Sequence, residues 1–150
     1  MKKVINLVLA VLTVGTINAQ WTYKTVNNGF DDPYKVAYTT SNNGAEAYLF
    51  ILDSAVMMEI SGTYYCDEYP SVDIVLAVNG VDNKFTFNGS KSNSSTVIYV
   101  TWDMGKEPGF VEAFKVASTM RVRINESYCT TEVYSYKMTN SKAAYDYMIK

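Results

Sequence analysis

Residues 71–87 predict a β-hairpin, which constrains the fold more than any other stretch of the chain. Asn79-Gly80 is a dipeptide favoured in a two-residue type I′ turn, because both central residues need a positive φ. Pairing around this turn gives one apolar face, formed by the pairs Val78–Val81, Ile74–Phe85 and Val72–Phe87. The opposite face is more polar and carries Asp73, Val75, Ala77, Asp82, Lys84 and Thr86. Such alternation is typical of an antiparallel sheet that packs on a core through one face.

The remaining chain predicts further strands around this pair. Runs rich in strand formers recur between turn clusters, over 21–26, 34–40, 46–52, 56–60 with 63–66, 96–102, 120–125 and 130–138. The fourth run is expected as one strand interrupted by a bulge at Ser61-Gly62. Helical spacing appears after residue 109, and Ser141 is expected to cap a short terminal helix. We therefore expect an all-β fold, an antiparallel β-sandwich of about 8–10 short strands with one or two short helices.

The first 19 residues are typical of a secretory signal peptide. Lys2 and Lys3 precede an apolar stretch over 4–14, and Ala19 offers a small residue for cleavage before Gln20. This apolar stretch is short for the hydrocarbon core of about 30 Å, which favours cleavage over a membrane anchor. We expect residues 1–19 to be removed and residues 20–150 to form a single secreted or periplasmic domain, with no membrane span after cleavage.

Export makes the cysteine count informative. Cys66 and Cys129 are the two cysteines of the chain, and an even number in an oxidising compartment predicts a disulfide. The alternative is a catalytic or metal-binding thiol. The chain has no histidine, so it cannot form a Cys–His nucleophile pair, and two cysteines alone make a poor zinc site.

Composition also excludes several classes of function. The formal net charge is −2, so no basic surplus draws the chain to nucleic acid. There is no Ser-His-Asp triad, no P-loop and no dinucleotide fingerprint, and no cofactor or metal is expected. A hydrolase would need two carboxyl groups across a cleft, with candidates Asp31, Asp32, Asp67, Glu68, Asp73 and Asp103. Asp31-Asp32 and Asp67-Glu68 are adjacent acidic residues whose oxygens could bind calcium, but neither pair shows the ligand spacing of a known calcium loop.

Aromatic residues are the one surplus, with 13 Tyr, two Trp and six Phe. Tyrosine suits binding surfaces because it supplies contact area and a hydroxyl at low entropic cost, although the same residues could pack a core. Tyr99, Arg121 and Arg123 are the residues expected on an outward binding surface.

The layout of the chain resembles small exported bacterial sandwich proteins, represented by VasI-like accessory proteins of type VI secretion and the invasion-associated locus B group. The resemblance rests on the signal peptide, an early Trp21, a cysteine-containing strand before 72–78, the stretch 110–114 and a strand from Met120. It covers the order of elements and no diagnostic motif. It implies a binding protein rather than an enzyme.

Three hypotheses follow from the sequence. The leading one is a non-enzymatic binding or accessory protein whose partner is an envelope or extracellular protein. The second is a protein like a carbohydrate-binding module, which would take a polysaccharide. A row of exposed coplanar aromatics on one sheet would favour this hypothesis, and buried tyrosines would contradict it. The third is a hydrolase that uses two loop carboxylates, which requires a cleft holding both.

Overall fold

The structure is a computed structural model that describes residues 21–27, 33–52, 55–62, 64–103 and 106–150. The expected signal peptide lies outside these residues. The described part contains nine strands and two helices: β1 (Thr22–Val26), β2 (Tyr34–Thr40), β3 (Glu46–Leu52), β4 (Ala55–Ser61), β5 (Ser71–Val78), β6 (Val81–Lys91), β7 (Val97–Asp103), α1 (Pro108–Val116), β8 (Thr119–Asn125), β9 (Glu132–Lys137) and α2 (Ser141–Met148). The expected all-β class with short helices is confirmed.

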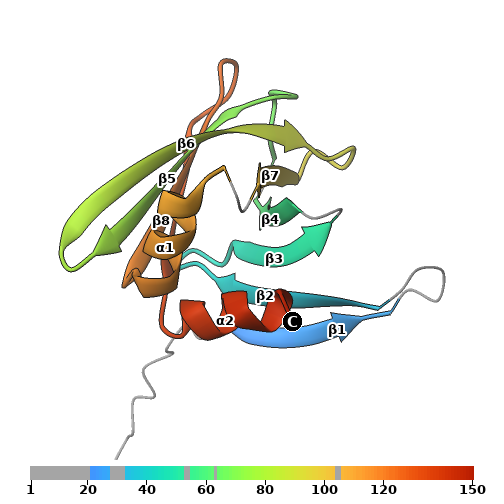
Figure 1. Cartoon of the computed structure of the whole chain (residues 1–150). Helices are drawn as coiled ribbons and strands as arrows, with labels where there is room; N and C mark the ends of the chain where they lie inside the picture. Colours follow the sequence, from blue (N-terminus) through green and yellow to red (C-terminus); the bar gives the residue numbers. More distant parts are fainter. Residues whose placement is uncertain (1–20, 28–32, 53–54, 63, 104–105) are drawn as a thin grey trace, which may run out of the picture.

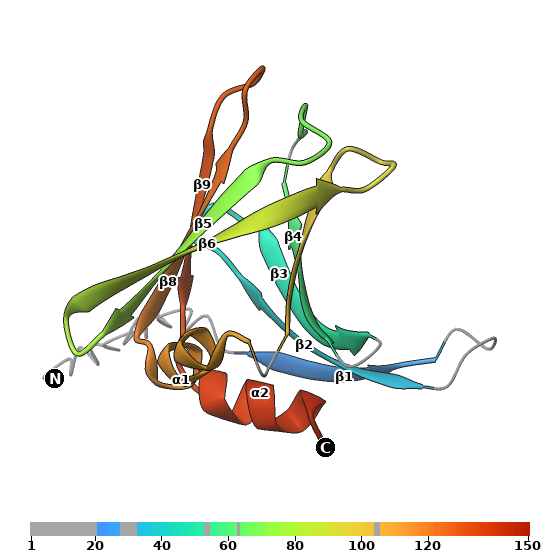
Figure 2. The same cartoon turned by 45° about the horizontal axis from the view of Figure 1, so that its top comes forward.

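All nine described strands belong to one antiparallel sheet, in the order β1-β2-β3-β4-β7-β6-β5-β8-β9. The sheet curls so that its two halves face each other across the core (Figures 1 and 2). Strand β6 joins the halves, because it pairs with β5 over residues 81–88 and then with β7 over residues 89–91. The two layers expected for a sandwich are therefore continuous through one long strand.

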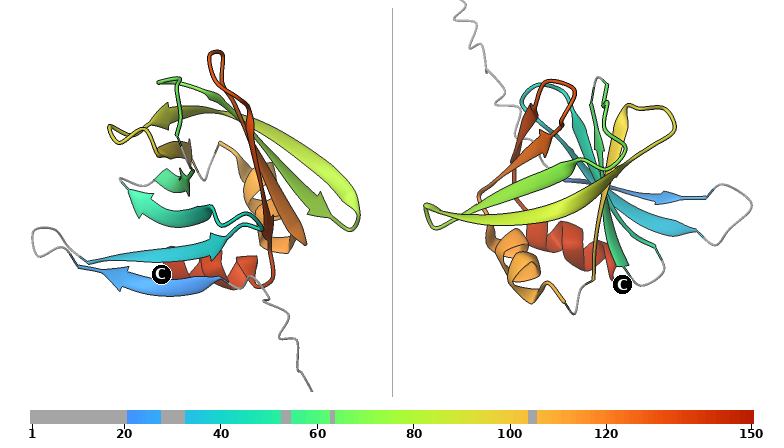
Figure 3. Two further views of the ribbon diagram at one scale, coloured as in Figure 1. Left: turned by 180° about the vertical axis from the view of Figure 1, so that it is seen from behind. Right: turned by 90° about the horizontal axis from the view of Figure 1, so that it is seen from above.

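The hairpin predicted over residues 71–87 is confirmed pair by pair. Val78 lies opposite Val81, and the register continues to Val72 opposite Phe87. Asn79 and Gly80 have φ values of 51° and 79°, as a type I′ turn requires. The apolar face does not reach the tip, however, where Val81 is 64% exposed because the hairpin extends beyond the rest of the sheet (Figure 3).

The two helices close one end of the curled sheet. Phe110 of α1 packs against Phe85, Phe87 and Trp102, with ring centroids 4.8–5.2 Å apart. Phe114, one turn later, contacts both Trp21 and Tyr145 of α2. The helical spacing after residue 109 thus places aromatic side chains into the core. No helix in the described part is long and apolar enough to cross a membrane.

Two local expectations are wrong. Strand β4 ends at Ser61, and residues 64–66 form no strand. Tyr65 instead turns into the core, where it is fully buried and its hydroxyl lies 3.0 Å from that of Tyr134. Ser141 does not cap α2: Asn140, with φ of 66°, occupies the N-cap, and the Ser141 hydroxyl donates to the carbonyl of Lys115.

Candidate functional site

Three connections gather at the end of the sheet opposite the helices, and we call them the loop end. They are the described residues 64–70 between β4 and β5, 92–96 between β6 and β7, and 126–131 between β8 and β9 (Figure 2). The first and third are joined by the Cys66–Cys129 disulfide, with the two Cα atoms 5.9 Å apart. The predicted disulfide is confirmed.

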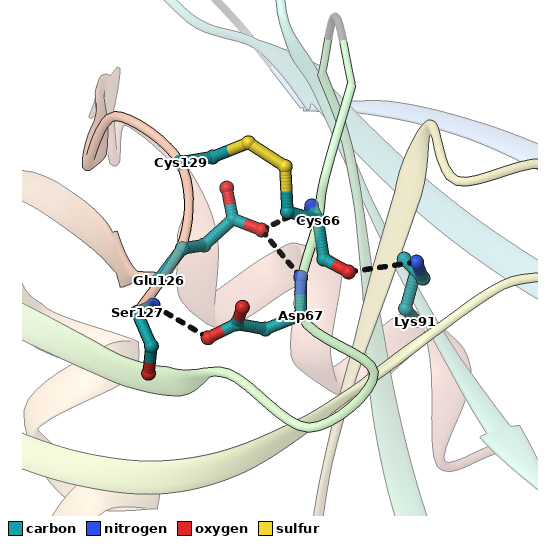
Figure 4. The surroundings of a disulfide bond; sticks show 6 residues. All are labelled: Cys66, Asp67, Lys91, Glu126, Ser127 and Cys129. Carbon is teal, nitrogen blue, oxygen red and sulfur yellow. Dashed lines mark hydrogen bonds between the residues drawn. A yellow bond between two sulfur atoms is a disulfide. The ribbon is translucent and has the colours of Figure 1, made fainter.

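Carboxylates hold the same two loops together beside the disulfide (Figure 4). One oxygen of Glu126 accepts the backbone N–H groups of Cys66 and Asp67, at 2.5 and 3.0 Å. Asp67 in turn accepts the N–H of Ser127 at 2.6 Å. Hydrogen bonds to a charged acceptor are stronger than neutral ones, so each loop fixes the backbone of the other.

A third loop segment joins this bracing from the side. The ammonium group of Lys91, at the end of β6, donates to the carbonyl of Cys66 at 3.0 Å (Figure 4). The backbone N–H of Tyr65 donates to the carbonyl of Ser95 in the connection between β6 and β7. The loop end is thus a cross-linked unit rather than three independent loops.

Three tyrosines project from this braced unit. Tyr64, Tyr69 and Tyr128 are 60%, 72% and 89% exposed. Tyrosine has two side-chain torsions and a polar tip, so a rigid loop can present it at low entropic cost. The tyrosine surplus therefore supplies both exposed surface and core. Four other tyrosines are buried in the core: Tyr65, Tyr134, Tyr136 and Tyr145.

A second feature lies on the outward face of β1–β4. Alternate residues of these strands line an open groove of about 400 Å³, formed by Lys24, Val26, Tyr34, Val36, Glu46, Tyr48, Phe50, Glu59 and Ser61. The face forms because side chains alternate along each strand and the strands pair in register. Tyr48 of β3 lies between Tyr38 of β2 and Glu59 of β4.

Aromatic and charged groups contact each other along this groove. The rings of Tyr38 and Tyr48 stack with centroids 5.2 Å apart and an interplanar angle of 24°. The Lys24 ammonium lies over both rings, 5.2 and 4.9 Å from their centroids. Such cation–π contacts hold the ammonium group over the two rings, while the lysine itself stays exposed to solvent.

The two carboxyl groups of the groove are held differently. Tyr48 donates its hydroxyl to Glu46 at 2.5 Å, and this bond, with burial and nearby carboxylates, raises the pKa of Tyr48 to about 12. Burial raises the pKa of the Glu59 carboxyl, and the charge of Lys24 partly opposes that effect. Among the described residues none donates a hydrogen bond to the Glu59 carboxylate. Glu59 therefore has acceptor capacity that the described residues do not fill.

The expected binding residues fall on two separate surfaces. Tyr99 of β7 pairs with Glu59 and lies next to the groove. Arg121 and Arg123 of β8 line a smaller depression of about 180 Å³ with Asp73. Strands β6 and β5 lie between β7 and β8 in the sheet, so Tyr99 does not join the arginines.

Asp73 is a buried carboxylate in the second depression. Burial opposes its ionisation, but Lys84 at 2.9 Å and hydrogen bonds from Thr86 and Asn125 outweigh burial and lower the pKa of Asp73. Arg121 is paired with Asp82. Two of the three cations that line this depression, Lys84 and Arg121, are therefore paired with carboxylates of the protein.

The loop acids considered for hydrolysis are dispersed. Asp31 and Asp32 lie outside the described residues. Asp67 braces the loop end, Asp73 is ion-paired on β5, and Asp103 pairs with Lys106 at the end of β7. Glu68 is exposed. In the part of the chain that the structure describes, no three His, Cys, Asp or Glu side chains are grouped to hold a metal.

No protein-family model, curated protein or solved structure matches this chain. The resemblance to VasI-like and invasion-associated locus B proteins therefore stays a prediction. The class that the structure supports is an all-β protein with a single curled sheet and a disulfide-braced loop end.

Proposed function

We propose that this protein is an exported, non-enzymatic binding protein whose loop end docks an envelope or extracellular protein. The observation that carries the proposal is the set of three exposed tyrosines on loops that a disulfide and a carboxylate pair brace: Tyr64, Tyr69 and Tyr128. A secreted or periplasmic location agrees with the disulfide, which persists in oxidising compartments.

Bracing supports binding through a physical argument. Ordering flexible loops on association opposes binding, so a surface held in place beforehand loses less free energy when a partner docks. Large tyrosines are enriched at protein interfaces because they combine apolar area with a hydrogen-bonding tip. The loop end combines both features, since its tyrosines lie within three residues of Cys66 or Cys129.

The test is capture of partners by purified residues 20–150 with the disulfide intact. The bait is exposed to envelope and culture-medium fractions of the source cells, and retained proteins are identified by mass spectrometry. A variant with Tyr64→Ser, Tyr69→Ser and Tyr128→Ser should lose the specific partner. Each substitution removes an aromatic ring that is exposed to solvent and does not pack in the core, so the variant should still fold.

The matched control is Val116→Ser, which removes an exposed apolar side chain at the helix end of the molecule. It should retain the same partner as the parent protein. The proposal is wrong if no protein is retained specifically, or if the triple variant retains the same proteins as the Val116→Ser control.

A further inference from the structure

The groove on the outward face of β1–β4 has features of a ligand site that the loop end does not explain. It shares no residue with the loop end, and its open volume is about 400 Å³. Aromatic rings form part of its wall, and two carboxylates and an ammonium group lie among them. We propose that this groove binds a neutral glycan.

The apolar part of the groove suits the face of a sugar ring. Tyr34 and Phe50 lie side by side on β2 and β3, with ring centroids 6.0 Å apart and an interplanar angle of 50°. Tyr34 is 39% exposed and Phe50 is half-buried, so both keep surface available to a ligand. The C–H groups on one face of a pyranose are apolar and pack well on such rings, as other apolar groups do.

The polar part suits sugar hydroxyls, which act as donors and acceptors. Glu46 is fixed by the hydroxyl of Tyr48, which leaves its remaining acceptor sites in a set orientation. Glu59 accepts no hydrogen bond from the described residues and is half-buried among aromatics. A hydroxyl that donates to this carboxylate would form a charge-assisted bond and satisfy a group that burial otherwise disfavours.

The charges of the groove select against other ligand classes. Glu46 and Glu59 outnumber Lys24, so an anionic glycan would meet net repulsion. The faces of Tyr38 and Tyr48, where a cationic ligand would lie, are already occupied by the chain's own Lys24. A neutral glycan can donate hydrogen bonds to the two carboxylates. It neither repels them nor competes with Lys24 for the faces of Tyr38 and Tyr48.

Affinity electrophoresis tests this proposal directly. Residues 20–150 are run in native gels containing dextran, galactomannan or xylan as neutral probes, with polygalacturonate as the anionic probe. At least one neutral polysaccharide should retard the protein. Phe50→Ala should weaken that binding about tenfold, because it removes one apolar contact surface. Glu59→Gln should weaken it as well, while keeping the size of the side chain.

Tyr128→Ala is the matched control, since it removes a highly exposed aromatic from the loop end instead of the groove. It should be retarded like the parent protein. Circular dichroism establishes whether each variant is folded. If Phe50→Ala does not fold, Glu59→Gln still tests the groove.

Three results would overturn the inference. They are an absence of retardation by every neutral probe, equal retardation of the folded groove variants and the parent, and stronger retardation by polygalacturonate than by the neutral probes. The outcome is separate from that of the partner capture, because Tyr128→Ala and the groove variants alter different surfaces. If the protein binds a neutral polysaccharide but captures no protein partner, only the proposed function is wrong. If it captures a partner but binds no neutral polysaccharide, only the glycan proposal is wrong.

Discussion

Glu59 shows at the scale of one residue why the groove is unusual. Its carboxylate lies between Tyr48 and Tyr99 on neighbouring strands, half-buried and without a hydrogen-bond donor among the described residues. Burial disfavours the charged form, so the pKa of Glu59 lies above its usual value despite Lys24. A group whose pKa is raised on folding stabilises the fold below its unfolded pKa and loses that contribution as the pH rises through the folded pKa.

We therefore expect Glu59→Gln to be more stable than the parent protein at pH 7. The gain should be no more than about 1 kcal/mol, because the groove is open to solvent and Lys24 already offsets part of the unfavourable charge. Urea unfolding at pH 7 and at pH 4 measures the gain, and the difference should be smaller at the lower pH, where more of the parent carboxyl is protonated.

The comparison variant is Glu112→Gln on the exposed side of α1, where the carboxyl is 75% exposed and pairs with Lys115. Its effect should stay within about 0.5 kcal/mol at both pH values. If Glu59→Gln were less stable than the parent at pH 7, the carboxylate would be stabilising and the argument for an unfilled acceptor would be wrong.

Single residues of the candidate sites were the hardest to predict from the sequence. The run 46–52 looks apolar on both faces, so nothing in it marks Glu46, Tyr48 and Phe50 as one outward-facing row. Their assembly with Glu59 depends on the register between β3 and β4. Arg121 and Arg123 were predictable as outward because β8 alternates cleanly, but their separation from Tyr99 depends on strand order.

At the scale of the element, the sequence predicted those strands and helices that depend on contacts between neighbouring residues in the chain. The hairpin over β5 and β6 follows from its turn dipeptide and alternation, and α1 follows from its helical spacing. The strand expected over 63–66 is wrong because a long-range contact competes with local propensity. Tyr65 is buried against Tyr134, a residue 69 positions away, and Gly62 gives both rings access to the backbone.

Gly62→Ala should therefore destabilise the protein. A Cβ atom at this position would lie 2.2 Å from the Tyr65 hydroxyl and 2.4 Å from the Tyr134 hydroxyl, so both of these buried side chains must move. We expect a loss of about 1–3 kcal/mol in the free energy of unfolding, as for other overpacked sites. Guanidinium chloride unfolding provides the measurement.

Gly109→Ala is the control, since a Cβ atom there meets nothing within 4 Å. It lies in the first turn of α1 and should leave stability unchanged or slightly higher, because alanine favours helix. Tyr65→Phe should recover part of the loss when combined with Gly62→Ala. Equal stability of the two single alanine variants would contradict this account of why β4 ends at Ser61.

At the scale of the whole molecule, one covalent bond ties together distant parts of the sheet. The disulfide joins positions 63 residues apart and encloses β5, β6, β7, α1 and β8. Such a cross-link removes conformational freedom chiefly from the unfolded chain, and more so when the loop is long.

Replacing both cysteines, as Cys66→Ala with Cys129→Ala, should lower the free energy of unfolding by about 4 kcal/mol on the chain-entropy model. Guanidinium chloride unfolding of the variant and the oxidised parent measures the change. The parent treated with a reductant should approach the variant, and intact mass after thiol alkylation should show no label before reduction and two labels after it. A loss below about 1 kcal/mol would mean that the carboxylate contacts of the loop end hold it without the bond.

The strand order also bears on how the chain finds its fold. Strands β5, β6 and β7 pair in succession through short connections, whereas β4 pairs with β7 and β5 pairs with β8 across long ones. The pair Ser61–Val97 and the pair Ala77–Thr119 close much longer loops than the hairpin does. Closing a loop becomes entropically harder as it lengthens. Strands β1 to β4 also pair in succession through short connections. Entropy therefore ranks the two meanders, β1–β4 and β5–β7, as the easiest parts to form, and the pairing of β4 with β7 that joins them as a harder step.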